Sequence, residues 1–371
     1  MRVAWITNDL VNFDGVLQPG GCALYRSMLP RGLLMDSQVS DFGRPAWTGQ
    51  HGYGVRMTKD VARFGYDVVV MKQMMQRWVP AEMEAAKKVG QKLVVDIDDH
   101  YDGLHQDNMA FETTDPTKNK ISNRDYYNQV IELADLVTVS TPFLLEYYKD
   151  QGVKDVRLAR NGISPIQFTR RKHTSVGKPV IGWVGAMKWR SGDAETLADW
   201  FGDFLEEHDL LFHHAGHMDD AKLFWDAAKI NPNRVLLSPM RIISEYHHMF
   251  NMDIGIVPLN DIDFNKAKST IKGLEYAASN IPFVAQATPE YMRLSELGVG
   301  RVAATPEQWQ AHLIELLDYK TRKREAAVQH NLVMKEHTVL ARKQEWLDAF
   351  EQFVGHNNKI KRFDVPYGVA G

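Results

Sequence analysis

Short apolar runs, separated by longer segments with a helical or loop pattern, recur along the whole chain. A first series lies at Val3–Ile6, Asp67–Met71, Leu93–Ile97, Leu136–Ser140 and Val156–Ala159. A second series lies at Val180–Val184, Leu210–His214, Val235–Leu237, Ile254–Val257, Phe283–Ala285 and Val302–Ala304. Near-continuous apolar runs of this length are typical of parallel strands that helices cover on both faces. The two series therefore predict an α/β protein with two doubly wound domains.

The pattern also predicts where these domains meet. Pro165, the charged run Thr169–His173 and Gly177 interrupt the alternation between the two series. We therefore expect a first domain over residues 1–170 and a second over 178–335. From about Lys320 onward the chain has a helical pattern, in which aromatic residues recur at helical spacing at Trp346, Phe350 and Phe353.

Composition narrows the class of protein. The 371 residues are 44% hydrophobic and 25% charged, which are ordinary globular values. A net charge of -3 disfavours a dedicated nucleic-acid binder, and a single cysteine excludes a disulfide framework or a cysteine-rich zinc site. No apolar run approaches the roughly 20 residues of a membrane span, and the start MRVAWITNDL lacks a signal-peptide layout. We expect a cytoplasmic protein without a transmembrane segment.

The segment Phe264–Tyr291 has the charge pattern with the clearest chemical meaning. Ser269 or Thr270 can serve as the N-cap of a helix that Asn280 and Pro282 bring to an end. The next apolar run then has room to form a buried strand.

Three lysines crowd the start of this helix, at positions Lys266, Lys268 and Lys272. The peptide dipole is already positive there, so an anion at the helix end would relieve the repulsion between the lysines. Glu275, one turn later, can accept hydrogen bonds from hydroxyls. A phosphate site followed by a diol site is the outline of a nucleoside diphosphate. The simpler alternative is a solvated helix with scattered lysines.

Glycines and carboxylates follow strands of the first series, at the sheet edge where doubly wound folds bind ligands. Gly20 and Gly21 allow a backbone to approach a ligand closely, although a tight turn explains them equally well. The absence of a G-x-G-x-x-G motif after the first strand disfavours a dinucleotide-dependent dehydrogenase. The third strand ends in three aspartates, Asp96, Asp98 and Asp99. Buried carboxylates at such a place need a cationic partner or a functional role. They are candidates for orienting an acceptor, for binding a divalent metal, or for capping a helix.

Two cations follow the first strand of the second series. Gly185 ends that strand, and Lys188 and Arg190 come directly after it. Both side chains are candidates for holding phosphates, the arginine in a bidentate manner. Taken alone, they are equally well explained as surface charges.

Together these segments resemble the glycosyltransferases of family 4, which have the two-domain GT-B architecture. The resemblance extends from Arg2 to about Phe353. It rests on the order of PGGCALYRSMLP, ADLVTVSTPFLLEYY followed by ARNGI, VIGWVGAM, DIGIVPL and KSTIKGLEYAASNIPFVA. The last segment is the most specific, and its K-S-x-x-K-x-x-E-Y pattern marks a subgroup with an Asp-rich third loop. The architecture implies two Rossmann-like domains facing across a cleft, a C-terminal helix (336–356) that packs back on the first domain, and a tail (357–371).

The resemblance also implies a donor site. Glu275 matches the distal glutamate of the family's paired-glutamate motif, which holds the ribose hydroxyls of the nucleotide. Ala267 stands where the proximal glutamate is expected, so we expect the loop Lys266–Ser269 to take over its contact with the donor sugar. The other donor-binding residues are expected to be Gly20, Gly21, Gly185, Arg190, Ser269, Thr270 and Lys272.

The implied reaction is a retaining transfer from a UDP-, GDP- or ADP-sugar that needs no metal or other cofactor. Lys188, Lys268 and Arg190 would stabilise the leaving phosphate, which takes the acceptor proton, and Asp98 or Asp99 would orient the acceptor or the sugar. The catalytic candidates are therefore Asp98, Asp99, Lys188 and Lys268. The acceptor stays open between a saccharide, a lipid-linked sugar, a protein and a modified nucleobase.

Two alternatives remain at this point. One is a metal-dependent transferase that uses Asp96 and Asp98 as the D-x-D pair of the one-domain GT-A fold. The other is a nucleotide-sugar-binding protein without transfer activity, which the missing glutamate at Ala267 leaves open.

Overall fold

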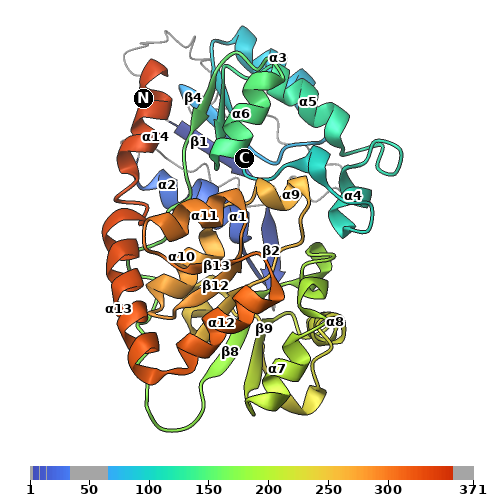
Figure 1. The fold of residues 1–371 in the computed structure, drawn as a ribbon. Helices are drawn as coiled ribbons and strands as arrows, with labels where there is room; N and C mark the ends of the chain where they lie inside the picture. Colours follow the sequence, from blue (N-terminus) through green and yellow to red (C-terminus); the bar gives the residue numbers. More distant parts are fainter. Residues whose placement is uncertain (1–2, 8, 14, 34–65, 354–371) are drawn as a thin grey trace, which may run out of the picture.

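The computed structural model describes residues 3–7, 9–13, 15–33 and 66–353, and it contains two parallel sheets, one above the other in Figure 1. The expected tail over 357–371 lies outside these residues. The first sheet has the strand order β1-β4-β5-β6-β7 and the second has the order β10-β9-β8-β11-β12-β13. The first sheet is built from β1 (Val3–Thr7), β4 (Val68–Lys72), β5 (Lys92–Ile97), β6 (Leu136–Val139) and β7 (Val156–Leu158). The second is built from β8 (Val180–Gly185), β9 (Leu211–Gly216), β10 (Val235–Pro239), β11 (Ile254–Val257), β12 (Phe283–Gln286) and β13 (Arg301–Ala303).

The predicted fold class is confirmed. Each predicted apolar run forms a strand of one of these sheets, and all neighbouring strands within them are parallel. The sequence reading missed an antiparallel hairpin of β2 (Leu10–Phe13) and β3 (Val16–Pro19), which lies between β1 and the paired glycines. The hairpin reaches the second half of the molecule, because the side-chain oxygen of Gln18 accepts a 2.9 Å hydrogen bond from the backbone N–H of Ile243.

Both faces of the first sheet are covered, as the continuous apolar runs predict. Alternate residues of β1 enter different clusters: Ala4 and Ile6 pack on one side, whereas Val3 and Trp5 pack on the other. The helices of this half are α3 (Val79–Lys88), α4 (Met109–Thr114), α5 (Arg124–Glu132) and α6 (Pro142–Asp150), with a 3₁₀ turn η3 (Tyr101–Gly103). After the paired glycines come α1 (Gly21–Ala23), a π-helical turn η1 (Leu24–Met28) and α2 (Leu29–Arg31).

Two further apolar clusters cover the second sheet, and one of them also includes Leu24 and Tyr25 from the first half. Tyr276, Phe283 and Ala285 belong to one, while Trp183, Phe212 and Trp309 belong to the other. Its helices are α7 (Phe201–Glu207), α8 (Ala221–Ala227), α9 (Asp263–Lys266), α10 (Ile271–Ala278), α11 (Pro289–Glu296), α12 (Pro306–Leu317) and α13 (Tyr319–Glu336). Its 3₁₀ turns are η4 (Met187–Trp189), η5 (Ala194–Leu197), η6 (Pro232–Arg234) and η7 (Ile243–Met249).

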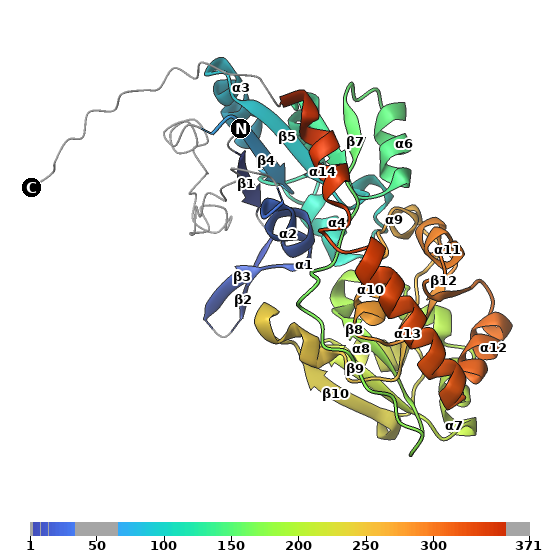
Figure 2. The ribbon, with the colours of Figure 1, turned by 90° about the vertical axis from the view of Figure 1, so that its left-hand side faces the viewer.

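The C-terminal part of the described chain returns to the first half, as the resemblance to the GT-B architecture implies. Figure 2 shows α13 beside the second sheet and α14 (Lys343–Phe350), which η8 (Glu351–Phe353) follows, beside the first. Trp346 of α14 is fully buried, with its ring centroid 5.9 Å from that of Trp5 in β1.

The chain crosses between the two halves twice, near Ile163 and again near Thr338, and the two crossing segments are hydrogen-bonded to each other. The N–H of Ile163 donates to the carbonyl of His337 at 3.0 Å, and the N–H of Val339 donates to the carbonyl of Ile163 at 2.9 Å. Gly162 makes this approach possible, because a Cβ there would lie 2.6 Å from the backbone nitrogen of Val339.

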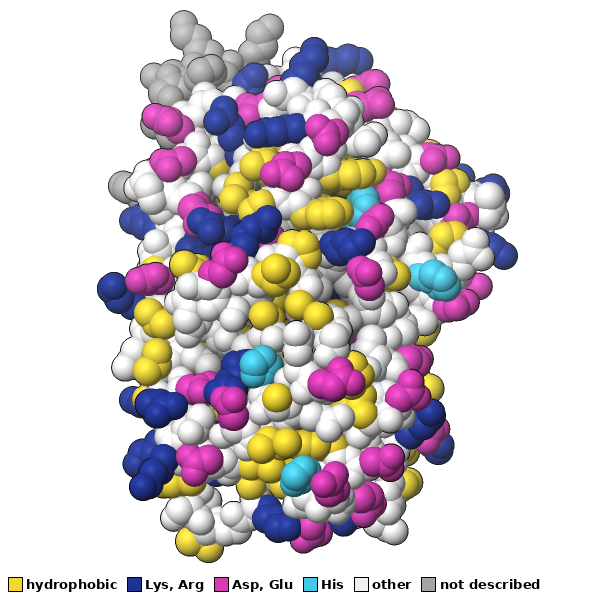
Figure 3. All heavy atoms as spheres, viewed as in Figure 1, with side chains coloured by type: hydrophobic (Ala, Val, Ile, Leu, Met, Phe, Trp, Pro, Cys, Tyr) yellow, Lys and Arg dark blue, Asp and Glu magenta, His cyan; other side chains and the backbone are white. Residues whose placement is uncertain are grey.

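The surface carries charges of both signs. On the face in Figure 3, basic and acidic side chains of the described residues are interspersed without a large area of either sign. Within the same residues, no helix is long and apolar enough to cross a membrane.

Candidate active site

A cavity of about 220 Å³ lies where the carboxyl ends of the two sheets face each other. The first half supplies Gly21, Cys22, Tyr25, Asp98, Asp99 and Asn161 to its lining. The second half supplies Arg190, Tyr246, Val257, Leu259, Lys268, Ser269, Ile271, Lys272, Glu275 and Tyr291. Because strand ends and helix starts meet here, this is the position at which doubly wound folds bind ligands.

The helix α10 begins at the cavity and ends as predicted. Thr270 is its N-cap residue, but the Thr270 side chain makes no capping hydrogen bond. The Tyr291 hydroxyl accepts a 3.3 Å hydrogen bond from the N–H of Gly273, which leaves the N–H groups of Ile271 and Lys272 available to a ligand. Asn280 ends the helix with a left-handed backbone (φ 60°), a conformation that asparagine tolerates better than most residues. Ser269 lines the cavity and accepts a 2.8 Å hydrogen bond from the Asn161 amide.

Three of the predicted cations line the cavity, and each interacts with a different partner. The Lys268 ammonium lies 3.3 Å from Asp99 Oδ1 and 4.0 Å from the centre of the Phe264 ring. Arg190 Nη1 lies 3.6 Å from Asp193 Oδ2. Lys272 donates to the carbonyl oxygen of Val184 at the end of β8. The three positive charges therefore converge on the start of α10.

Lys272 is the most perturbed of these cations. It is only 8% exposed, and burial lowers the pKa of its ammonium to about 8. The carboxylate of Glu275 opposes this shift, while the positive charges of Arg190 and Lys268 add to it. A diphosphate in the cavity would supply the negative charge that this lysine lacks.

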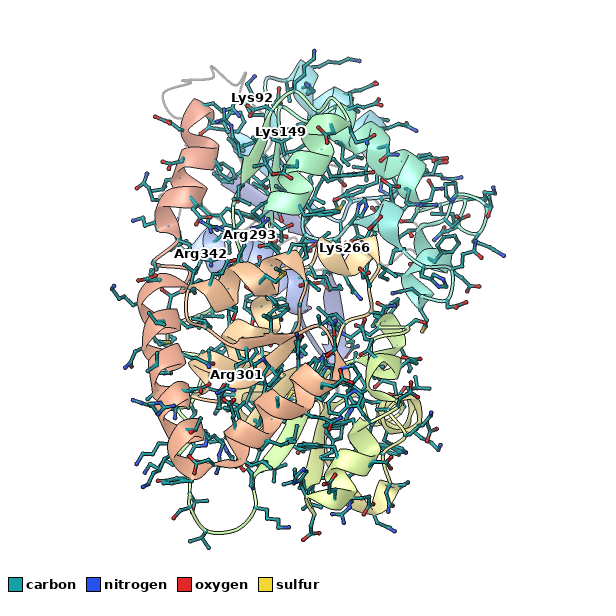
Figure 4. The ribbon with its side chains drawn as sticks, viewed as in Figure 1. Lys92, Lys149, Lys266, Arg293, Arg301 and Arg342 are labelled. Atoms are coloured by element: carbon teal, nitrogen blue, oxygen red, sulfur yellow. The ribbon has the colours of Figure 1, made fainter. Side chains whose placement is uncertain are left out.

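Lys188 and Lys266 point away from the cavity, contrary to the sequence prediction. The Lys188 ammonium pairs with Asp219, and its backbone N–H donates to Asp220 at 3.3 Å. Lys188 belongs to the 3₁₀ turn η4, whereas Arg190 directly follows that turn with a non-helical backbone, so the two side chains are not held on one face. Lys266 lies on the outer side of α9, where it forms ion pairs with two nearby aspartates (Figure 4).

Glu275 forms the floor of the cavity. It is 3% exposed, and burial raises the pKa of its carboxyl, although Lys272 and two tyrosine hydroxyls oppose the shift. The Tyr25 hydroxyl donates to Oε1 at 2.5 Å and the Tyr246 hydroxyl donates to Oε2 at 3.2 Å. Tyr25 belongs to η1 in the first half, so this hydrogen bond crosses the cleft.

The three aspartates after β5 have different surroundings. Asp96 is fully buried and binds the Arg26 guanidinium at 2.9 and 2.6 Å, with a further 2.6 Å hydrogen bond from Thr138. It therefore belongs to the core and does not line the cavity. Asp98 and Asp99 do line the cavity, where each pairs with a lysine (Lys72 and Lys268, respectively).

The paired glycines have unequal roles. The carboxylate of Asp9 accepts a 2.6 Å hydrogen bond from the N–H of Ala23, and a Cβ at Gly20 would lie 1.9 Å from its other oxygen. Gly20 is thus required by packing, whereas Gly21 lines the cavity and has open space around the position of a Cβ.

Two other predicted donor residues lie beside the cavity. Gly185 does not line the cavity, contrary to the prediction. It packs closely against β9, since its carbonyl oxygen would be 1.8 Å from a Cβ at Gly216. Thr270 faces a separate cavity of about 60 Å³, which Arg293 and Arg342 also line (Figure 4).

Several residues at the site escaped the sequence analysis. Lys72 does not line the cavity but pairs with Asp98, which does. It had a recognisable signal, because a lysine directly follows the apolar run of β4 at the ligand-binding edge. Carboxylates raise the pKa of its ammonium even though burial opposes the shift. Asn161 reads as a turn residue but bridges Ser269 and Arg26. Tyr25 and Tyr246 have no local signal, because only folding brings them to Glu275.

Comparisons with known proteins identify the fold. No protein-family model matches the sequence, and no curated protein shows a significant match. The structure is similar to that of Anabaena HepE in complex with UDP-glucose, with a TM-score of 0.63 and 15% identity over 95% of this chain and 100% of that chain.

Two further solved structures agree. A glycosyltransferase from Rickettsia africae has a TM-score of 0.61 and 11% identity over 96% of this chain and 98% of that chain. The sucrose-phosphate synthase of Thermosynechococcus elongatus has a TM-score of 0.59 and 11% identity over 95% of this chain and 98% of that chain. The similarity over nearly the whole length confirms the GT-B architecture.

Proposed function

We propose that this protein is a glycosyltransferase that moves a sugar from a nucleoside-diphosphate sugar to an acceptor hydroxyl with retention of configuration. The observation that carries the proposal is the convergence of Arg190, Lys268 and Lys272 on the start of α10, with Glu275 behind them. A diphosphate suits the cations and the free N–H groups, and a ribose diol suits the carboxylate.

The similar structures support this assignment. HepE was crystallised with UDP, with UDP and glucose, and with UDP-glucose. We propose a UDP-, GDP- or ADP-sugar as donor for this chain, because the described residues do not single out one base. We also place the chain in family 4, for which the K-S-x-x-K-x-x-E-Y segment at Lys268–Tyr276 is the most specific support.

The chemistry follows from the charges. Lys268, Arg190 and the start of α10 would stabilise the negative charge that develops on the leaving diphosphate. The acceptor oxygen bonds to the anomeric carbon as the bond from that carbon to the diphosphate breaks, and the departing phosphate takes the acceptor proton. Asp98 and Asp99 are already held in ion pairs, so we assign them to orienting the sugar or acceptor. Lys188 has no part in this scheme because it pairs with Asp219.

The structure weakens the case for a D-x-D metal site. Asp96 is fully buried, and both of its carboxylate oxygens accept hydrogen bonds from Arg26, one of them also from Thr138. It is therefore not available to bind a cation together with Asp98. Among the described residues, Cys22, Asp98 and Asp99 are the one group that could hold a metal ion. The lysines bound to both aspartates already supply positive charge there. We therefore propose a metal-independent reaction; a complete loss of turnover in EDTA that manganese restores would refute it.

Glu275→Gln tests the donor site directly. Titration calorimetry with UDP, GDP and ADP first identifies the nucleotide that binds. The substitution keeps the shape of the side chain but removes its charge, so binding of that nucleotide should weaken by about 1.5–3 kcal/mol. The 2′,3′-dideoxy form of the same nucleotide lacks the diol and should lose little further affinity in the variant.

Glu290→Gln is the matched control, since Glu290 is a largely buried carboxylate that pairs with Arg293 outside the cavity. It should leave nucleotide affinity unchanged. Equal affinities of the wild type and Glu275→Gln for the ribose-containing nucleotide would remove Glu275 from the donor site.

NMR of the anomeric proton in the first-formed product checks retention of configuration, and an inverted product would refute that part of the proposal.

A further inference from the structure

A second cavity, of about 520 Å³, continues from the first on the side of α4. The two cavities share Cys22, Asp99, Arg190 and Lys268, so the Lys268–Asp99 ion pair stands at their border. Its volume is in the range of sites that enclose small ligands. A ligand here would present a group to the point where the proposed donor carries its reactive carbon.

The walls beyond this border are polar but uncharged. They carry amides and hydroxyls from Gln73, Asn108, Thr113, Thr114, Asn119 and Ser122. Among the described lining residues, the carboxylates and cations are confined to the border and to Asp9 beside the paired glycines. Asn108, Thr113 and Asn119 already use some of their donors and acceptors within the protein. Amides and hydroxyls can each make more than one hydrogen bond, and their remaining positions suit a neutral hydroxyl-rich ligand.

Aromatic rings accompany these polar groups. Trp189, Phe264 and Tyr101 line the same cavity, and Trp189 is 46% exposed although it is a large apolar side chain. The carbonyl of Trp189 accepts a 3.0 Å hydrogen bond from the Asn108 amide, which fixes the tryptophan of the second half against α4 of the first. Sugar rings present C–H groups on one face, and the electron-rich face of an indole attracts them.

Gln73 is held in an unusual conformation at the cavity wall. It directly follows β4 and has φ 55°, in the left-handed region that residues other than glycine rarely adopt. Its amide donates to the Tyr101 hydroxyl. Strained residues of this kind cluster at binding sites, where the surroundings hold them in place.

We propose that this second cavity binds the acceptor and that the acceptor is an uncharged saccharide. The inference rests on the proposed transferase function and names its second substrate. A lipid tail has no hydrogen-bond donor or acceptor, so it could not use the remaining hydrogen-bonding positions of these polar walls. A nucleic acid would need cations along the path of its phosphates, but the cations of the lining stand at the border and pair with Asp99 and Asp193.

Two variants test the saccharide site. Trp189→Ala removes the exposed ring without touching its carbonyl, and Gln73→Asn draws the amide back by one methylene while keeping a residue that tolerates the left-handed backbone. Binding of maltotriose, cellotriose, mannotriose and triacetylchitotriose is measured by saturation-transfer NMR and calorimetry on the whole chain. At least one trisaccharide should bind, and each variant should bind it about tenfold more weakly or not at all. Leu340→Ala, which removes another exposed apolar side chain that is not part of the lining, should bind it as the wild type does.

Other ligands and the nucleotide complete the test. The same variants are titrated with single- and double-stranded oligonucleotides, phospholipid vesicles and serine-rich peptides. The proposal is overturned if no trisaccharide binds, if both variants bind as well as the wild type, or if one of these other ligands gives the Trp189-dependent binding instead. Nucleoside diphosphate affinity, measured in parallel, should be unchanged in both variants. Trp189-dependent trisaccharide binding without any nucleotide binding would support the saccharide site while refuting the transferase.

Discussion

At the scale of single residues, the site depends on charges that the fold has partly desolvated. Lys272 lies among apolar and polar groups of the core, and its ammonium is held by a backbone carbonyl rather than by a carboxylate. Such a lysine is still mostly charged at neutral pH, but it loses its charge at a lower pH than an exposed lysine does, and a bound diphosphate would oppose that loss.

This predicts a pH dependence of nucleotide binding. Because burial lowers the pKa of Lys272 to about 8, the free protein loses this positive charge as pH rises through 8. A diphosphate prefers the charged form and raises the pKa in the complex. Affinity should therefore be nearly constant between pH 7 and about 7.5 and fall above pH 8, by at most about tenfold per pH unit. Calorimetry between pH 7 and 9 measures this profile.

Two substitutions separate Lys272 from other groups that titrate in this range. Lys272→Met should bind more weakly and without the fall above pH 8, whereas Lys272→Arg keeps a positive charge throughout. A profile in Lys272→Met that still falls as in the wild type would assign the titration to another group.

At the scale of elements, close backbone approaches decide how the pieces fit. The passages at Gly162–Ile163 and Thr338–Val339 pair like two short strands, and they join the halves of the molecule beside Asn161 and the start of α10. The geometry of this crossing thus sets the position of α10 relative to the first sheet.

Gly162→Ala tests the crossing. The added Cβ would meet the backbone nitrogen of Val339 at 2.6 Å, and backbone atoms cannot move aside as a side-chain end can. We expect a loss of about 1–3 kcal/mol in the free energy of unfolding, measured by urea denaturation. Gly32→Ala is the control, because Gly32 has φ -69° and nothing within 4 Å of the Cβ position. An unchanged stability of Gly162→Ala would show that the two passages can separate freely.

At the scale of the whole molecule, α14 ties the end of the chain to its beginning. Trp346, Ala349 and Phe350 share a buried cluster with Val3 and Trp5 of β1, while the second sheet is covered by separate clusters. The first sheet therefore depends on a helix that comes after the entire second half in the sequence.

Removing the contact between α14 and β1 should lower the stability of the first half alone. Trp346→Ala should destabilise the first sheet by about 3–5 kcal/mol, because it empties a large volume in a closed cluster. Hydrogen exchange should show faster opening in β1 and β4 and little change in β8 and β11. Trp309→Ala, in a cluster of the second sheet, should give the opposite pattern. If both variants accelerated exchange equally in both sheets, the halves would unfold as one cooperative unit and the assignment of separate cores would fail.

Much of the architecture follows from local pattern. The strands of both sheets are continuous apolar runs, which local sequence reveals because both faces of a parallel strand are buried. The hairpin of β2 and β3 was missed, since β2 leaves Val11 exposed and Asn12 on the surface instead of forming a buried run. The cationic start of α10 was also readable, because Lys268, Lys272 and the helix end lie close together in the sequence.

The sequence by itself determined the doubly wound fold, the two sheets and the cations around α10, since each depends on the spacing of neighbouring residues. Only the tertiary structure decided which carboxylate pairs with Arg26, that Lys188 faces Asp219, and that Tyr25 and Tyr246 meet at Glu275. Side-chain direction and burial set these partners. Both depend on contacts between segments far apart in the chain, which no local pattern encodes.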